Sequence, residues 1–198
     1  MPGDFLNRTP QITMRQFHAF RDTRPEEEKW ELIDGVPMMM PPPTLVHQRI
    51  AANLDRLLNN RLEAVRPQWR ADREVGIWLE SDDKYNPEPD VTVIDAEIRL
   101  GQIYVERFYL VAEVLSESDQ PAVLEAKLAY YKSHPHNCGV LFVRQDRIGA
   151  ILHRRVANDA WETETLTRAE QPVIIPTIGP IGPLAALYRH TPLDPAAA

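Results

Sequence analysis

Two carboxylates and a lysine are the residues of this sequence whose types and spacing suggest chemistry. Glu113 is the one charged residue in the apolar segment FYLVAEVLS, and Asp90 follows Pro89 at the start of DVTVID. A buried carboxylate is usually paired, protonated or bound to a metal, because burial penalises its charged form. On neighbouring strands the two carboxylates could hold one hard cation such as Mg²⁺, which prefers oxygen ligands, activates water and stabilises charge on a phosphoryl oxygen.

Lys127 lies where it could bring a second positive charge to the same place. It borders an apolar helical stripe formed by Leu124, Leu128 and Tyr131, at about 60° from Leu124 around the helix. A helix that starts near residue 119 rises about 12 Å by residue 127. Because the chain reverses before this helix, the lysine stem could bring its ammonium group alongside Glu113, close to an attacking water.

Each of these residues also has a purely structural interpretation. Asp90 could cap a turn, and Glu113 could form a salt bridge with Arg73 or Arg107. Lys127 could keep its ammonium group in water while its stem covers apolar surface. The three residues together indicate a catalytic site more specifically than any one of them alone, because three independent structural explanations would have to hold at once.

Apolar periodicity predicts the elements that would position these residues. Thr13 and Gln16 form a Thr-x-x-Gln capping box. Thr44 precedes a long sequence with apolar residues at helical spacing. The predicted elements are a helix over 13–22, a hairpin over 30–40 around Asp34-Gly35, a helix over 44–65, strands over 74–80, 90–95 and 107–116, a helix over 119–134 capped by Ser118 or Asp119, and strands over 138–146, 148–155 and 161–166. This order predicts an α/β (α+β) fold, in which a central mixed β-sheet is flanked by α-helices.

Length and composition are those of an ordinary globular protein. The 198 residues, 43% hydrophobic and 26% charged, predict one domain over residues 1–185 and a C-terminal tail over 186–198. A single cysteine excludes an intrachain disulfide, and no apolar run reaches the roughly 20 residues that span a bilayer, so a cytoplasmic protein without a membrane segment is expected. The net charge of −7 counts against tight, sequence-independent nucleic-acid binding. It leaves room for a local basic groove, or for an acidic site that works through bound metal.

Six short segments occur in the order typical of a known family. They are WELIDG, MMPPPTLVHQRI, EPDVTVID, YLVAEVLS, EAKLAYY and CGVLFV. Through them the sequence resembles, from residue 12 to residue 185, the Uma-two family of restriction-endonuclease-like proteins. That family is a largely uncharacterised group within the PD-(D/E)XK nuclease superfamily. The resemblance implies a restriction-endonuclease-like fold and a metal-dependent endonuclease that hydrolyses phosphodiester bonds of nucleic acid, DNA above all.

The resemblance also implies roles for individual residues. Asp90, after Pro89, and Glu113 match the two acidic positions that bind Mg²⁺ or Mn²⁺. Leu115 stands where most of the superfamily has its lysine, and Lys127 matches a lysine that replaces it from the following helix. These three residues, Asp90, Glu113 and Lys127, are therefore the expected catalytic set.

Two further residues match frequent positions of the family. Glu31 is expected to be a further acidic ligand, and His47 to contact substrate phosphate or a ligand carboxylate. The sequence departs from the family pattern at SESD over 116–119, where Ser-Pro-Ser is common, and in HPHNCGVLFV, which lacks the usual Glu-Tyr-Trp. Neither departure involves an expected ligand, although the first could alter how the helix of Lys127 starts.

Two other functions are compatible with the same residues. A catalytically inactive protein of this fold would bind nucleic acid or a protein partner without cleaving, and the acidic net charge favours that reading. A carboxylate-pair hydrolase such as a glycosidase would not need the lysine, and no aromatic sugar platform accompanies the site segments. Because dimerisation is common in the superfamily, the resemblance further implies a homodimer whose two sites cut two strands.

Overall fold

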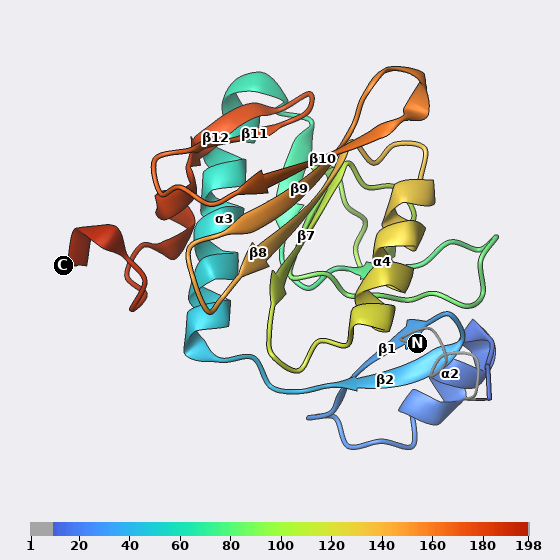
Figure 1. Cartoon of the computed structure of the whole chain (residues 1–198). Coiled ribbons are helices and arrows are strands. Elements are labelled where there is room, and N and C mark those ends of the chain that lie inside the picture. Colours follow the sequence, from blue (N-terminus) through green and yellow to red (C-terminus); the bar gives the residue numbers. More distant parts are fainter. Residues whose placement is uncertain (1–9, 198) are drawn as a thin grey trace.

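A six-stranded mixed sheet forms the centre of the protein (Figure 1). The computed structural model describes residues 10–197. The strand order is β10-β9-β8-β7-β5-β3, with bounds β3 Trp69–Asp72, β5 Val91–Asp95, β7 Leu110–Leu115, β8 Gly139–Arg144, β9 Ala150–Arg155 and β10 Trp161–Leu166. β7 and β8 are parallel, and the other neighbouring strands are antiparallel. The predicted central mixed sheet is therefore confirmed.

Two helices cover the two faces of this sheet. α3 (Leu45–Val65) lies on one face and α4 (Pro121–Ser133) on the other (Figure 1). The sheet has one hydrophobic core on each face, and strand β7 contributes to both. Ala112 and Val114 pack on the α3 side, and Val111 packs on the α4 side. Because successive side chains of a strand point to opposite faces, Glu113 shares the α4 face with Val111. The expected charge in the middle of a core strand is thus directed toward the helix that carries Lys127.

The N-terminal segment forms a helix and a hairpin beside the end of the sheet. α2 (Met14–Arg21) begins with the predicted capping box of Thr13 and Gln16. β1 (Lys29–Ile33) and β2 (Val36–Met40) are joined by Asp34 and Gly35, whose φ angles are 49° and 73°. Two residues with positive φ give the turn type whose twist suits a hairpin. The hairpin places β1 against α4 (Figure 1).

The C-terminal segment packs against α3 and completes the core between that helix and the sheet. The strands β11 (Pro172–Ile175) and β12 (Gly179–Pro183) form a small sheet, followed by the 3₁₀ helix η2 (Leu184–Tyr188), and both β12 and η2 contact α3. Leu187 and Tyr188 are fully buried there. The boundary predicted at residue 185 therefore falls inside η2. The remaining 3₁₀ helices are η1 (Ala157–Asp159) and η3 (Pro195–Ala197).

Some details differ from the sequence-based prediction. The strand expected over 74–80 is reduced to β4 (Gly76–Ile77), which pairs with β6 (Tyr104–Val105) outside the central sheet. The sixth central strand is instead β3, whose sequence WRAD contains no apolar run that would indicate a strand. α4 begins after Gln120 rather than after Ser118 or Asp119. Within residues 10–197, no helix combines the length and the apolar character needed to cross a membrane.

Candidate active site

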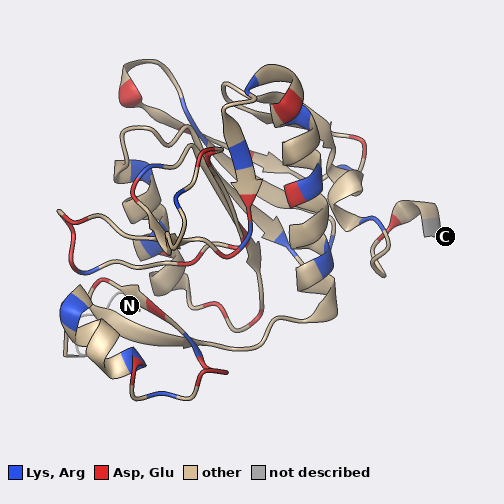
Figure 2. Cartoon of the chain, turned by 180° about the vertical axis from the view of Figure 1, so that it is seen from behind, with Lys and Arg blue, Asp and Glu red and all other residues tan. Residues whose placement is uncertain are grey.

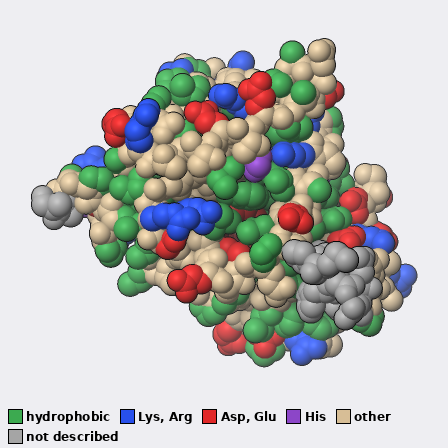
Figure 3. Space-filling model, viewed as in Figure 1, with side chains coloured by type: hydrophobic (Ala, Val, Ile, Leu, Met, Phe, Trp, Pro, Cys, Tyr) green, Lys and Arg blue, Asp and Glu red, His purple; other side chains and the backbone are tan. Residues whose placement is uncertain are grey.

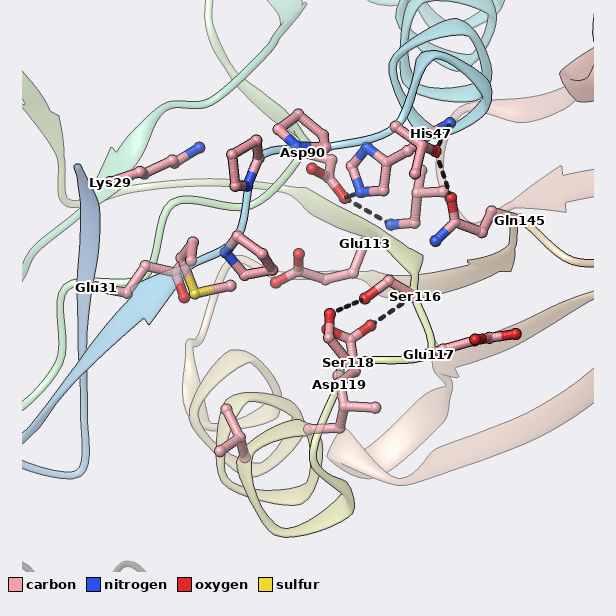
Figure 4. A pocket seen from close by; sticks show the side chains of 18 of the residues that line it. Lys29, Glu31, His47, Asp90, Glu113, Ser116, Glu117, Ser118, Asp119 and Gln145 are labelled. Atoms are coloured by element: carbon pink, nitrogen blue, oxygen red, sulfur yellow. Dashed lines mark hydrogen bonds and ion pairs between the residues drawn. The ribbon is translucent and has the colours of Figure 1, made fainter. Parts of the chain in front are cut away.

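A cavity of about 600 Å³ lies where the end of β7 meets the N-terminal hairpin. Its walls come from β1, the prolines at 41–43, the start of α3, the residues before β5 and the segment that leads into α4. The five residues singled out in the sequence all line it, namely Glu31, His47, Asp90, Glu113 and Lys127. Figure 4 shows the side chains of Asp90 and Glu113 pointing into this space from neighbouring strands. The structure thus brings together residues that span almost one hundred positions of the chain.

Asp90 is held at one of its two carboxylate oxygens. Its Oδ2 accepts a hydrogen bond of 2.6 Å from the backbone N–H of Val114 and lies 3.2 Å from Nε2 of His47. His47 stands in the first turn of α3, where its own N–H is capped by the Thr44 hydroxyl. Both side chains are largely buried, with 16% of Asp90 and 13% of His47 exposed. The structure therefore places the His47 imidazole on the carboxylate of Asp90.

Glu113 is likewise held at one oxygen. Its Oε1 accepts a hydrogen bond of 2.7 Å from the Tyr131 hydroxyl and lies 3.1 Å from Nζ of Lys127. Tyr131 follows Lys127 by four residues, so both project from the same side of α4. The rival pairing of Glu113 with Arg107 is not formed, because Arg107 binds Asp95 at 2.6 Å.

Lys127 bridges two buried carboxylates. Its Nζ lies 2.7 Å from Oε2 of Glu31 and 3.1 Å from Oε1 of Glu113, and only 4% of its side chain is exposed. The other oxygen of Glu31 accepts a hydrogen bond of 2.9 Å from the backbone N–H of Glu88. The ammonium group is thus enclosed, and the alternative in which it reaches water at the helix border is wrong.

Burial and neighbouring charges shift the protonation equilibria of these groups. Burial raises the pKa of Glu113 to about 7, since the pull of Lys127 toward lower values is opposed by the carboxylates of Asp90 and Glu31. Burial by itself would lower the pKa of Lys127, but the two carboxylates outweigh it and raise that pKa above its usual range. His47 behaves similarly: burial would lower its pKa, but the hydrogen bond to Asp90 and the nearby carboxylate charges together outweigh burial and raise that pKa. At neutral pH the lysine is a cation, and Glu113 lies close to its titration midpoint.

The two carboxylates each retain one oxygen without a protein donor. Among the described residues, no hydrogen bond reaches Oδ1 of Asp90 or Oε2 of Glu113, whereas Oδ2 and Oε1 are both engaged. Residues 10–197 contain no group of three or more His, Cys, Asp or Glu side chains arranged around one metal position. Mg²⁺ is commonly bound through one or two carboxylates while it keeps several waters. The donor set therefore fits a hard cation that retains water.

The cavity lining as a whole is acidic rather than basic. Its carboxylates are Glu31, Glu74, Glu88, Asp90, Glu113, Glu117, Asp119 and Asp146, against the lysines Lys29 and Lys127. Figure 2 shows Lys and Arg spread along both flanking helices and the strands, and Figure 3 shows them scattered among acidic and apolar side chains on the face drawn. A phosphate backbone would thus meet a negative cavity unless a cation were bound in it.

The sequence predicts the pairing of Lys127 with Glu113 and a carboxylate contact for His47, but not the other contacts of the site. The apolar stripe of α4 includes Tyr131, and only the structure places its hydroxyl on Glu113. The spacing of four residues between Lys127 and Tyr131 was the available signal. The pairing of Lys127 with Glu31 had no such signal, because Glu31 is distant in sequence and its strand packs against α4 only in the folded chain.

Comparisons with known proteins identify a family and a common fold. A family model named Uma2 and described as "Putative restriction endonuclease" matches residues 14–183. Among solved structures, a crystal structure described as a putative nuclease belonging to DUF820, from Anabaena variabilis ATCC 29413, superposes with a TM-score of 0.70. The two share 17% sequence identity, and the match covers 89% of this chain and 97% of the other, so it establishes a common fold. No curated protein matches this chain.

Proposed function

Because the chain belongs to the Uma2 family, whose description is "Putative restriction endonuclease", we propose that this protein is a metal-dependent endonuclease. It would hydrolyse phosphodiester bonds of nucleic acid, and DNA is the proposed substrate. The observation that carries the proposal is the meeting of Asp90, Glu113 and Lys127 at one cavity. Two carboxylates with free oxygens beside a charged lysine form a donor set suited to phosphoryl chemistry.

Asp90 and Glu113 would hold the proposed Mg²⁺ or Mn²⁺. Such a cation, when bound, polarises a phosphoryl oxygen and lowers the pKa of a coordinated water. The contribution of the chain is to fix the two carboxylates in advance. Val114 and His47 hold Asp90, and Tyr131 holds Glu113. Donors of this kind, which orient ligands without touching the metal, also tune its affinity.

Lys127 would stabilise negative charge on the reacting phosphate and orient the attacking water. Its raised pKa keeps it cationic at neutral pH. An efficient general base has a pKa near the working pH, so electrostatic stabilisation suits this lysine better than proton abstraction does. Glu31 would serve as the second carboxylate that keeps the buried ammonium charged, since both of its oxygens are already engaged within the protein.

A catalytically inactive relative that binds a partner is the second candidate. The acidic lining of the cavity favours it, because eight carboxylates face two lysines there. Such a protein would keep the fold and its buried ion pairs without a need for metal. Metal binding by the isolated protein therefore separates the two candidates before any substrate is known.

The test is nicking of supercoiled plasmid by the purified protein with Mg²⁺, with Mn²⁺ and with EDTA. We expect nicking that requires the metal and is lost in Lys127→Met. The matched control is Lys132→Met on the same helix, because Lys132 lies in its last turn and contacts Trp161 rather than the cavity. Nicking that survives EDTA, or that is equal in both variants, would refute the proposed site.

The proposal extends to a homodimer, in which two copies present one site to each strand of a duplex. Sedimentation should then give a mass of about twice the 22.7 kDa of one chain. A monomer that cuts both strands at wild-type rate would remove this part of the proposal and leave the rest intact.

A further inference from the structure

The buried hydroxyl of Tyr131 holds one oxygen of the Glu113 carboxylate. It donates to Oε1 of Glu113 at 2.7 Å, on the oxygen that Lys127 also approaches at 3.1 Å. The Tyr131 side chain is completely buried. Its ring meets Phe108 edge to face, and its backbone carbonyl accepts a hydrogen bond from Asn137. Tyr131 is therefore fixed at both its ring and its backbone.

Lys127 and Tyr131 differ in how firmly they can hold that oxygen. A lysine has a long, flexible stem with several rotatable bonds, whereas a tyrosine ring has two. In the proposed function Lys127 also has a task toward the phosphate and the water. If the Glu113 carboxylate is not to rotate during the reaction, one donor must stay on Oε1. Tyr131 is more rigid than Lys127 and is suited to that role.

We propose that Tyr131 is a positioning residue that keeps Oε1 of Glu113 engaged, so that Glu113 offers a divalent cation Oε2 alone. This inference rests on the proposed function. Asp90 shows the same division, with Oδ2 held by the backbone of Val114 and Oδ1 free. Two carboxylates that each present a single oxygen favour Mg²⁺, which demands regular octahedral geometry and retains waters. Ca²⁺ accepts six to eight ligands and often takes both oxygens of a carboxylate.

Metal selectivity tests the role of Tyr131 more sharply than metal affinity alone. Tyr131→Phe removes the hydroxyl and keeps the ring. Loss of an orienting partner typically weakens metal binding by about tenfold or more. With Oε1 held by the flexible Lys127 side chain alone, Glu113 can turn to bind through both oxygens, so we expect Mg²⁺ affinity to fall by about tenfold and Ca²⁺ affinity to fall less. The ratio of the two dissociation constants should shift by about threefold or more toward Ca²⁺.

The adjacent tyrosine provides a matched control. Tyr130 is also buried, and its hydroxyl has no hydrogen-bond partner among the described residues. Its ring stacks on Tyr85, away from Glu113. Tyr130→Phe therefore removes an equivalent hydroxyl from the same helix without a change at the site. Isothermal titration calorimetry of wild type, Tyr131→Phe, Tyr130→Phe and Asp90→Ala with Mg²⁺ and with Ca²⁺ gives the comparison, with no substrate present.

The outcomes distinguish this inference from the proposed function. A shifted ratio in Tyr131→Phe, an unchanged one in Tyr130→Phe and no binding by Asp90→Ala would support both. Wild-type selectivity in Tyr131→Phe would overturn the positioning role while the metal site stands. Absence of divalent binding by the wild type would overturn the metal-dependent function and this inference with it.

A structure of the wild type soaked with Mn²⁺ keeps the inference testable if Tyr131→Phe does not fold. Coordination through Oε2, with Oε1 still on the Tyr131 hydroxyl, would support it. Coordination through Oε1 would overturn it.

Discussion

Replacement of Lys127 by methionine should destabilise the folded protein in a way that depends on pH. The substitution keeps most of the stem volume and removes the ammonium group that lies 2.7 Å from Glu31 and 3.1 Å from Glu113. Both carboxylates then lose their cation within a site where 2% and 10% of their side chains are exposed. Removal of one member of a buried ion pair typically costs about 3–5 kcal/mol of unfolding free energy. We expect a loss of that size at pH 8.

The pH dependence follows from the raised pKa of Glu113. In the wild type that pKa is raised from 4.5 to about 7, so the stability that protonated Glu113 provides is present at low pH and is lost as the pH rises through about 7. Without Lys127 the folded protein retains this proton to still higher pH. Above pH 7 the variant then loses stability relative to the wild type as the pH rises. The difference between the two proteins should be smaller at pH 6 than at pH 8, by on the order of 1 kcal/mol.

Urea unfolding followed by tryptophan fluorescence at pH 6 and pH 8 measures both quantities. Lys132→Met is the control, since Lys132 is only partly buried in the last turn of the same helix, contacts the Trp161 ring and forms no ion pair within residues 10–197, so its loss should change the unfolding free energy by less than about 1 kcal/mol at either pH. A Lys127→Met protein as stable as the wild type at pH 8 would refute the reasoning. It would mean that the two carboxylates do not need the ammonium group to remain buried.

The remaining predictions concern metal binding and packing. Wild-type Mn²⁺ affinity should rise by about tenfold per pH unit between pH 5 and pH 6.5, because the proton on Glu113 must leave, and a pH-independent dissociation constant in calorimetry would contradict this. Glu113→Gln should remove Mn²⁺ binding, whereas Glu31→Gln should weaken it by about tenfold; equal loss in both would make Glu31 a direct ligand. Leu54→Ala should lower the unfolding free energy by about 2–5 kcal/mol, and Leu45→Ala, 80% exposed, by about 0.5 kcal/mol or less, as judged by urea titration. Similar values for the two leucines would contradict the packing of α3.

The elements with long, regular patterns could be predicted from the sequence. α3 shows apolar residues at helical spacing over many turns, and β7 and β8 are nearly continuous apolar runs, as expected of strands buried on both faces. β3 was missed because its four residues include Arg70 and Asp72, and it lies at the sheet edge. An edge strand has one pairing partner and one open side, so its sequence needs little apolar character.

The candidate site was predictable where one residue contradicted its surroundings. Glu113 stands out because a charge in the middle of a core strand needs a partner. Lys127 stands out because it is a cation on the next helix, within reach of Glu113. Glu31 could be linked to them only through family resemblance, since no local pattern connects β1 with α4. The hydroxyl of Tyr131 was hidden for a different reason: a tyrosine in an apolar stripe is equally well explained by packing.

The position of the lysine on a helix has a physical consequence for the rest of the fold. Leu115 lies two residues after Glu113 on the same face of β7, and α4 packs over that face, so Lys127 reaches Glu113 from above instead of along the strand. On the helix, however, the ammonium group is enclosed. A lysine at the end of the strand would instead be open to the cavity. Glu113 titrates near pH 7, so it alone would neutralise the enclosed ammonium group only in part. A second carboxylate is therefore needed to keep the buried lysine charged. Glu31 supplies it from β1, held in turn by the backbone of Glu88. On this reasoning the N-terminal hairpin is not an appendage to the sheet, because a lysine on α4 can stay charged in the core only while β1 is packed against it.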